Sequence, residues 1–97
     1  MKYTIRYTGQ FKRSYKLCKK RGYDISKLEI VIRLLSENGE LPDMYQPHKL
    51  VGRKWSGYWE CHIEPNWLLV WDQNDTDLVL LFLDTGTHSD LFKHRPY

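Results

Sequence analysis

Alternating and helically spaced apolar positions predict one strand and then two helices in the first part of the chain. Apolar residues alternate with polar ones over Lys2–Tyr7, which is the pattern of a half-buried strand. Thr8 is placed to cap a helix over Gly9–Arg21, and Asp24 to cap a second over Ile25–Glu37. The second helix has an i, i+3, i+4, i+7 apolar stripe, which consists of Leu28, Val31, Ile32 and Leu35.

The second half of the chain predicts a loop and then three strands. Leu41–Trp55 has no clear period and contains prolines, so it is expected to be a loop long enough to bind or catalyse. Pro65-Asn66 is expected to be a two-residue turn within the strand region. The expected strands are Gly57–Glu64, Trp67–Asp72 and Asp77–Leu83, and a short helical turn is expected over Ser89–Phe92. The fold class is therefore α+β: an N-terminal strand, a two-helix hairpin, and a three-stranded antiparallel meander that completes one sheet.

Strand alternation sorts the side chains of the first hairpin between two faces. With a two-residue turn, Ile63 is expected to pair with Leu68 and Cys61 with Val70, which gives an apolar face for the helices to cover. His62 then points to the opposite, open face. Core packing does not explain a histidine at that position.

Composition bounds the class of protein. The 97 residues are expected to form a single domain, with 1–92 as its core and 93–97 as a tail. We expect a cytoplasmic protein without a membrane segment, because no long apolar run or signal peptide is evident. Cys18 and Cys61 are far apart, so free thiols are expected rather than a disulfide or a metal site. The net charge is +3, and basic residues cluster at Lys12, Arg13, Lys16, Lys19, Lys20 and Arg21, a pattern that attracts a polyanion or an acidic partner.

Histidines supply the candidate chemistry. His62 lies in GYWECHIEPNW, His88 lies in TGTHSDLF, and His48 precedes both. An imidazole exchanges protons near neutral pH, so three of them among basic and aromatic residues indicate acid–base chemistry on a phosphodiester. No metal-ligand spacing or thiol-nucleophile motif competes with this interpretation, and no cofactor is expected.

An ordered set of motifs resembles type II toxins of the RelE/ParE superfamily, which have a microbial-RNase-like fold, and in particular the YafQ branch. Each motif is weak evidence alone, but their order along about residues 1–92 is specific. After the helical hairpin come H-x-L-x-G, W-x-G-Y, the C-H-I-x-P-N-W hairpin and G-T-H-S-x-L-F, at His48–Gly52, Trp55–Tyr58, Cys61–Trp67 and Gly86–Phe92.

The resemblance implies a ribosome-dependent mRNA endonuclease that needs no metal. In that mechanism the ribose 2′-hydroxyl attacks the adjacent phosphorus, leaving a cyclic phosphate and a free 5′-hydroxyl. The resemblance makes His88 the leading acid or base, with His62 and His48 as partners, and leaves open which is acid and which is base. Trp67 and Phe92 match the rim of the family's site, where an aromatic side chain can stack on an unpaired base.

One further assignment comes from the residues themselves, and one from a departure from the family pattern. Arg53 and Lys54, in the expected loop, are suited to binding a phosphate. Asn66 occupies a catalytic position where the family often has aspartate, and an amide can neither accept a proton nor add charge beside a histidine. Either the aspartate serves only to position its neighbours and Asn66 substitutes for it, or activity here is reduced.

The resemblance also implies partners. These are a DinJ/RelB-like antitoxin with a ribbon-helix-helix DNA-binding half, the ribosome with its mRNA, and operator DNA through the antitoxin only. An acidic amphipathic antitoxin segment would suit the basic helix. We expect ribosome or antitoxin contacts at five of its residues, which are Lys12, Arg13, Lys16, Lys19 and Lys20.

Alternatives remain open at this stage. The chain could be a ParE-like gyrase inhibitor, or a catalytically weak toxin that mainly binds antitoxin and co-represses its operator. The basic run could be a solvated helix face. His88 could merely cap a turn, and His62 could be a sheet-surface residue bonded to Glu60 or Glu64.

Overall fold

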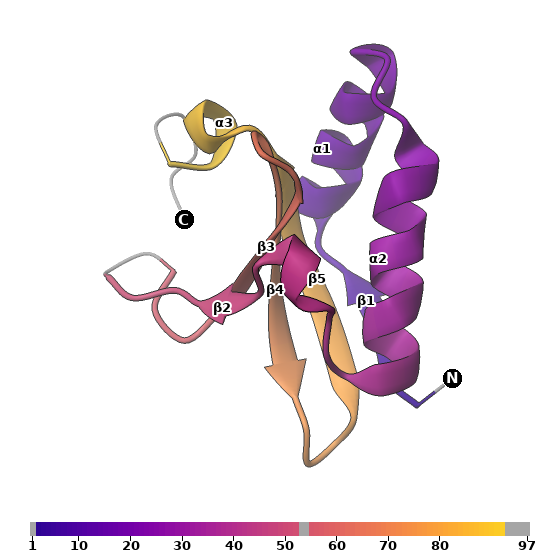
Figure 1. Cartoon of the computed structure of the whole chain (residues 1–97), viewed down its shortest axis with the longest axis vertical. Helices are drawn as coiled ribbons and strands as arrows, with labels where there is room; N and C mark the ends of the chain where they lie inside the picture. The colour runs from indigo at the N-terminus through magenta and orange to yellow at the C-terminus, as the bar shows by residue number, and fades with distance from the viewer. Residues whose placement is uncertain (1, 53–54, 93–97) are drawn as a thin grey trace.

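A five-stranded sheet with two long helices on one face forms the body of the molecule (Figure 1). The computed structural model describes residues 2–52 and 55–92. The helices are α1 (Gly9–Lys20), α2 (Ile25–Asn38), the 3-10 turn η1 (Asp43–Tyr45) and α3 (His88–Phe92). The strands are β1 (Thr4–Tyr7), β2 (His48–Lys49), β3 (Trp59–Glu64), β4 (Trp67–Asn74) and β5 (Val79–Gly86). Within the described ranges, no helix is both long and apolar enough to cross a membrane.

Side-chain caps define the two long helices where the sequence predicts them. The hydroxyl of Thr8 accepts a hydrogen bond from the backbone N–H of Phe11 at the start of α1. Asp24 does the same for Ser26 at the start of α2. Gly39 ends α2 in the left-handed conformation, with φ of 71°, where a side chain would be strained. The predicted helical hairpin is confirmed.

The sheet is mixed: the expected three-stranded meander is antiparallel, and the N-terminal strand joins it in parallel. The strand order is β1-β5-β4-β3-β2, and β1 lies parallel to β5 at one edge. Parallel pairing of β1 with β5 requires a long connection between them. The helical hairpin provides part of it, because it carries the chain from the end of β1 back across the sheet before the meander begins. The strand β2 lies inside the expected loop. It has only two residues, too few to produce an alternating pattern.

The pairing of β3 with β4 differs by one residue from the expected register. Glu64 faces Trp67 across the predicted two-residue turn, but Cys61 then faces Leu69 instead of Val70, and His62 faces Leu68. A bulge between His62 and Glu64 accounts for the shift. Residues that pair directly across two strands point to the same face of the sheet. The bulge shifts the register by one residue, so the strands keep their two-residue turn and their apolar side chains still share a face.

Side chains pack on both faces of the sheet. The expectation that the face opposite the long helices is open is therefore wrong. The main core lies under α1 and α2 and includes Cys61 and Ile63. A second apolar cluster covers part of the other face, and its buried members are Trp55, Leu68, Val70 and Leu91. Leu91 brings α3 against this cluster. The second cluster therefore fixes the position of the short helix that begins at His88.

Candidate active site

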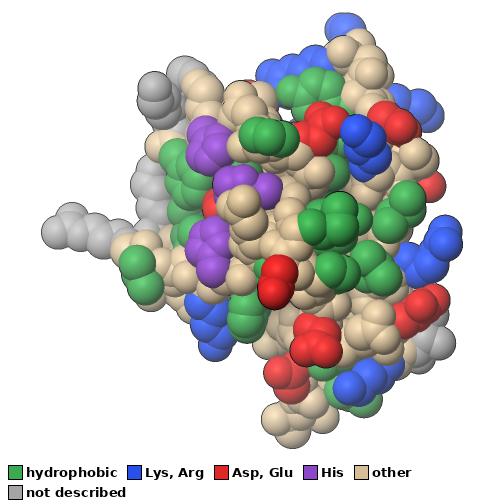
Figure 2. All heavy atoms as spheres, in the orientation of Figure 1, with side chains coloured by type: hydrophobic (Ala, Val, Ile, Leu, Met, Phe, Trp, Pro, Cys, Tyr) green, Lys and Arg blue, Asp and Glu red, His purple; other side chains and the backbone are tan. Residues whose placement is uncertain are grey.

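Three histidines from three separate elements meet on the sheet face away from the long helices. His48 comes from β2, His62 from β3, and His88 from the first position of α3. The ring centroids of His48 and His62 are 6.3 Å apart, and those of His62 and His88 are 5.8 Å apart. Figure 2 shows the histidine side chains gathered on one face of the molecule. The fold thus brings together the three residues that the sequence separates by up to forty positions.

Asn66 fixes the orientation of His88. Its side-chain oxygen accepts one hydrogen bond from the backbone N–H of His88 at 3.1 Å, and lies 2.7 Å from Nδ1 of the same residue. A backbone N–H can only donate, so the amide must present its oxygen here. Nδ1 of His88 therefore carries a hydrogen, and in the neutral ring Nε2 has a free lone pair that can accept a proton.

A buried carboxyl group lies beneath the other two histidines. Glu60 is 4% exposed, and its Oε1 lies 3.2 Å from Nε2 of His48 and 3.7 Å from Nε2 of His62. Burial raises the pKa of Glu60, and the nearby histidines His48, His62 and His88 oppose that shift. The sequence interpretation considered Glu60 only as a surface partner of His62. Burial of Glu60 depends on β2 and the second apolar cluster, which the periodic pattern did not reveal.

The two aromatic residues expected at the rim have different environments. Phe92 is 40% exposed, and its ring centroid lies 6.3 Å from that of His88, so it has a free surface beside the histidines. Trp67 is 1% exposed, packs edge-on against Tyr23 and donates a hydrogen bond to Thr85 Oγ1. The expectation that Trp67 lies at the rim is wrong, because a side chain enclosed in the core offers no face to a base.

A hollow of about 360 Å³ adjoins His62 and is lined in part by Met44, Gln46 and Pro65. The proposed phosphate-binding pair, Arg53 and Lys54, lies outside the described residues. No group of three or more His, Cys, Asp or Glu side chains in the described ranges is arranged to hold a metal ion.

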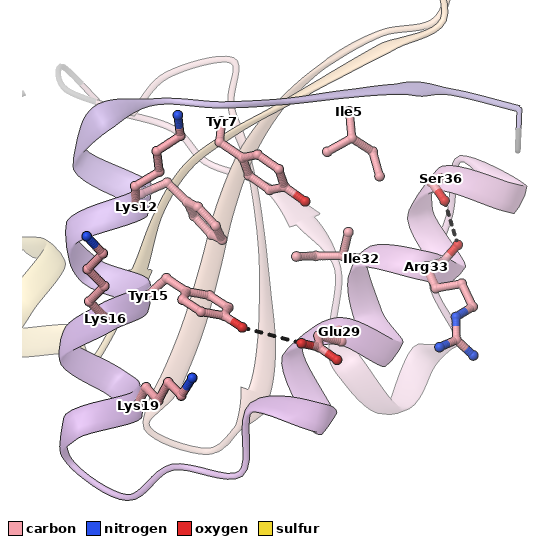
Figure 3. A pocket seen from close by; sticks show the side chains of 11 residues that line it. Ile5, Tyr7, Lys12, Tyr15, Lys16, Lys19, Glu29, Ile32, Arg33 and Ser36 are labelled. Atoms are coloured by element: carbon pink, nitrogen blue, oxygen red, sulfur yellow. Dashed lines mark hydrogen bonds between the residues drawn. The ribbon is translucent and has the colours of Figure 1, made fainter.

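A larger hollow lies elsewhere, between α1 and α2. This groove, of about 680 Å³, is bordered by β1 as well as by both helices. Ile5, Tyr7, Tyr15 and Ile32 contribute apolar surface, and Figure 3 shows side chains of all three elements facing the space between the helices. The basic residues that line it are Lys12, Lys16, Lys19 and Arg33. Of the other basic residues expected to bind partners, Arg13 and Lys20 are exposed on α1 but do not line the groove.

The fold agrees with that of known structures, and the sequence matches a known family. A profile of the family described as "Bacterial toxin of type II toxin-antitoxin system, YafQ" matches residues 3–93. This chain belongs to the YafQ toxin family. The resemblance inferred from the motifs is therefore confirmed.

Relatives with known structures share most of their length with this member of the YafQ family. The mRNA interferase toxin YafQ of Escherichia coli K12 is 43% identical over 89 residues, which are 91% of this chain and 94% of that protein. The crystal structure of YafQ from E. coli BL21(DE3) is 40% identical with a TM-score of 0.85, covering 93% of this chain and 98% of the other. The E. coli DinJ–YafQ toxin–antitoxin complex gives a TM-score of 0.84 at 40% identity, covering 95% and 99%. These matches confirm the α+β fold class.

Proposed function

We propose that this toxin is a ribosome-dependent endoribonuclease that cleaves mRNA by histidine acid–base catalysis and requires no metal. The observation that carries the proposal is the cluster of His48, His62 and His88, with His88 held by Asn66. A similar protein, 43% identical, is an mRNA interferase, and its name gives the substrate class. The three imidazoles provide enough groups for one proton acceptor and one donor.

The proposed reaction begins at the ribose 2′-hydroxyl. Nε2 of His88 takes the hydroxyl proton while O2′ attacks the adjacent phosphorus, and the bond from phosphorus to O5′ breaks. A second histidine protonates O5′, and the products are a 2′,3′-cyclic phosphate and a 5′-hydroxyl. Positive charge on the histidines also stabilises the phosphoryl oxygens in the transition state. Phe92 is placed to stack on a base beside His88.

The ribosome is proposed to hold the mRNA in the orientation needed for in-line attack. The hollow beside His62 has a volume of about 360 Å³. A hollow of that size holds only a small part of an mRNA, so we propose that the ribosome positions the rest, and correct positioning of the reacting groups is worth several kcal/mol of barrier. The exposed basic residues of α1 would add salt-sensitive contacts to ribosomal RNA.

The groove between α1 and α2 is proposed to bind an acidic amphipathic segment of the cognate antitoxin. Its apolar lining matches one face of such a segment, and Lys12, Lys16, Lys19 and Arg33 match acidic residues at its margins. The similar YafQ of E. coli forms a complex with DinJ, so a DinJ-like partner that carries its own ribbon-helix-helix DNA-binding half is proposed here. Operator DNA would be contacted through that partner.

The test is primer-extension mapping of an mRNA in a reconstituted translation system. Wild type, His88→Ala and His94→Ala would be compared, with and without ribosomes. His94 is the matched control because it follows the family-like core. Cleavage by wild type and His94→Ala that requires ribosomes and is lost in His88→Ala supports the proposal. Absence of cleavage by folded, antitoxin-free wild type overturns it and favours gyrase inhibition or a purely complex-forming role.

A further inference from the structure

Glu60 is the one carboxyl group that contacts two of the three clustered histidines within the described part of the chain. It lies on β3 directly opposite His48 of β2, and its side chain is 6% exposed. Its contacts to His48 and His62, at 3.2 and 3.7 Å, involve the same oxygen, Oε1. A buried carboxylate is costly unless it is paired with positive charge, so its surroundings determine where protons reside.

The contacts of His48 require an additional proton on this pair. Nδ1 of His48 lies 2.8 Å from the backbone oxygen of Gln46, and a carbonyl oxygen only accepts, so Nδ1 carries a hydrogen. Nε2 faces the carboxyl oxygen of Glu60 at 3.2 Å, where two unprotonated atoms would repel each other. Either His48 is an imidazolium or Glu60 is a neutral acid. In either state, one proton lies between Nε2 of His48 and Oε1 of Glu60.

His88 is held in the opposite way. Its partner, Asn66, is neutral and accepts from Nδ1, which leaves Nε2 of the neutral ring as an acceptor. The carboxyl group thus lies beneath His48 and His62, and the neutral amide lies beside His88. This asymmetry separates a proton-rich side of the site from a proton-accepting side.

We propose that Glu60 is a positioning residue that keeps a proton on Nε2 of His48. His48 delivers this proton to the leaving O5′, and His88 accepts the proton of the 2′-hydroxyl. The inference rests on the proposed endoribonuclease function and assigns acid and base within it. In the step, the 2′-hydroxyl loses its proton to Nε2 of His88, the P–O5′ bond breaks, and O5′ gains the proton from Nε2 of His48. Solvent then returns a proton to the His48–Glu60 pair and removes one from His88. His62, between the two, adds positive charge near the phosphoryl oxygens.

Burial makes a charged Glu60 costly, and the histidines around it offset part of that cost. Desolvation raises the pKa of this carboxyl group, and the histidines that face it from β2, β3 and α3 lower it. The groups that face Glu60 are thus His48, His62 and His88. Desolvation disfavours an unpaired carboxylate, so retaining a proton on His48 lowers the cost of the buried charge.

Four measurements on one set of variants test the proposal. Glu60→Gln keeps the shape of the side chain and removes its charge, Glu60→Asp keeps the charge, and Glu37→Gln is the control on the exposed end of α2. Nitrogen-15 NMR of the imidazoles in free toxin reports their protonation across pH 5–9. Single-turnover cleavage on mRNA-programmed ribosomes reports the chemistry, and co-sedimentation reports ribosome binding. Thermal unfolding confirms that each variant is folded.

The expected result is that Glu60→Gln cleaves about 100-fold more slowly while binding ribosomes normally. The nitrogen-15 signals of His48 should move towards those of a singly protonated ring in this variant, and those of His88 should change less. Glu60→Asp should restore part of the rate, and Glu37→Gln should match wild type. A folded Glu60→Gln variant with the wild-type rate, or with an unchanged His48 titration, overturns the assignment. Absence of cleavage by wild type refutes the proposed function instead, and the NMR titration then still decides whether Glu60 holds the proton on His48.

Discussion

The guanidinium of Arg21 donates two hydrogen bonds to the carboxylate of Asp90, at 2.7 and 3.2 Å, and so ties the end of α1 to α3. Asp90 also accepts from the backbone N–H of Thr87, whose hydroxyl accepts from the backbone N–H of Asp90. This reciprocal pair is a capping box at the start of α3. Because α3 begins at His88, a charge on Asp90 holds the proposed base in place.

We expect Asp90→Asn to lower the free energy of unfolding by about 1 kcal/mol at pH 7, since it weakens a cap and an ion pair. Hydrogen bonds from Arg21 and Thr87 hold the pKa of Asp90 well below its usual 3.8. The stabilisation by the Asp90 carboxylate is therefore fully present above pH 3.8 and is lost as the pH falls below that value. Urea unfolding at pH 7 and pH 2.5 should show the difference between wild type and variant shrinking at the lower pH.

The control for this prediction is Asp72→Asn, on the exposed part of β4. It should change stability little at either pH. A difference between wild type and Asp90→Asn that grows on acidification would contradict the role assigned to the carboxylate.

We expect Asn66→Ala to slow single-turnover cleavage by roughly 100-fold, because His88 loses the acceptor that fixes its ring. Asn66→Asp keeps an acceptor for both hydrogen bonds from His88 and should stay within roughly tenfold of wild type. Cleavage assays on programmed ribosomes measure both variants. Wild-type cleavage by Asn66→Ala would show that the amide does not position the base.

Trp67 is expected to affect stability, not substrate binding. Trp67→Ala should cost about 3–5 kcal/mol, the usual range for removing a large core side chain. Trp67→Phe keeps most of the packing and removes the bond to Thr85, at a cost of about 1 kcal/mol plus a smaller packing loss. Below its melting temperature the phenylalanine variant should cleave normally. A stable variant with impaired cleavage would restore Trp67 to the substrate site.

Charge reversal in the groove should weaken antitoxin binding. Replacing Lys12, Lys16 and Lys19 by glutamate puts negative charge along one side of the groove, and affinity for the cognate antitoxin should fall roughly tenfold or more. Isothermal titration at two salt concentrations measures the change, which should be larger at low salt. The double variant Arg13→Glu and Lys20→Glu, outside the groove, should bind antitoxin more tightly than the triple variant. Equal losses in both would indicate a general charge effect and no specific groove.

Ribosome binding should depend on the exposed basic side of α1. Changing Lys16, Lys19 and Lys20 to glutamate removes phosphate contacts without removing core residues, so the domain should remain folded. Co-sedimentation with ribosomes should decrease, and circular dichroism should be unchanged. Unchanged co-sedimentation of the triple variant would refute this assignment.

Local chemistry in the sequence was sufficient to predict the helices, the hairpin turn and the histidine motifs. Thr8 and Asp24 cap the helices through bonds to residues two or three positions away, and Pro65-Asn66 forms its turn within four residues. Such interactions are encoded by neighbours in the chain. The resemblance to a toxin family was evident from motif order alone, without any knowledge of how the motifs meet.

Contacts between distant segments decided the rest. The parallel pairing of β1 with β5, the short β2, the bulge beside Ile63 and the burial of Trp67 each depend on residues far apart in the chain. Periodicity shows which residues share a face, but it does not show which strand lies beside which or how deeply a face is covered. Glu60 illustrates the limit. The sequence places it on the same strand face as His62, and only the docking of β2 and the second apolar cluster turns a surface carboxylate into a buried one between two histidines.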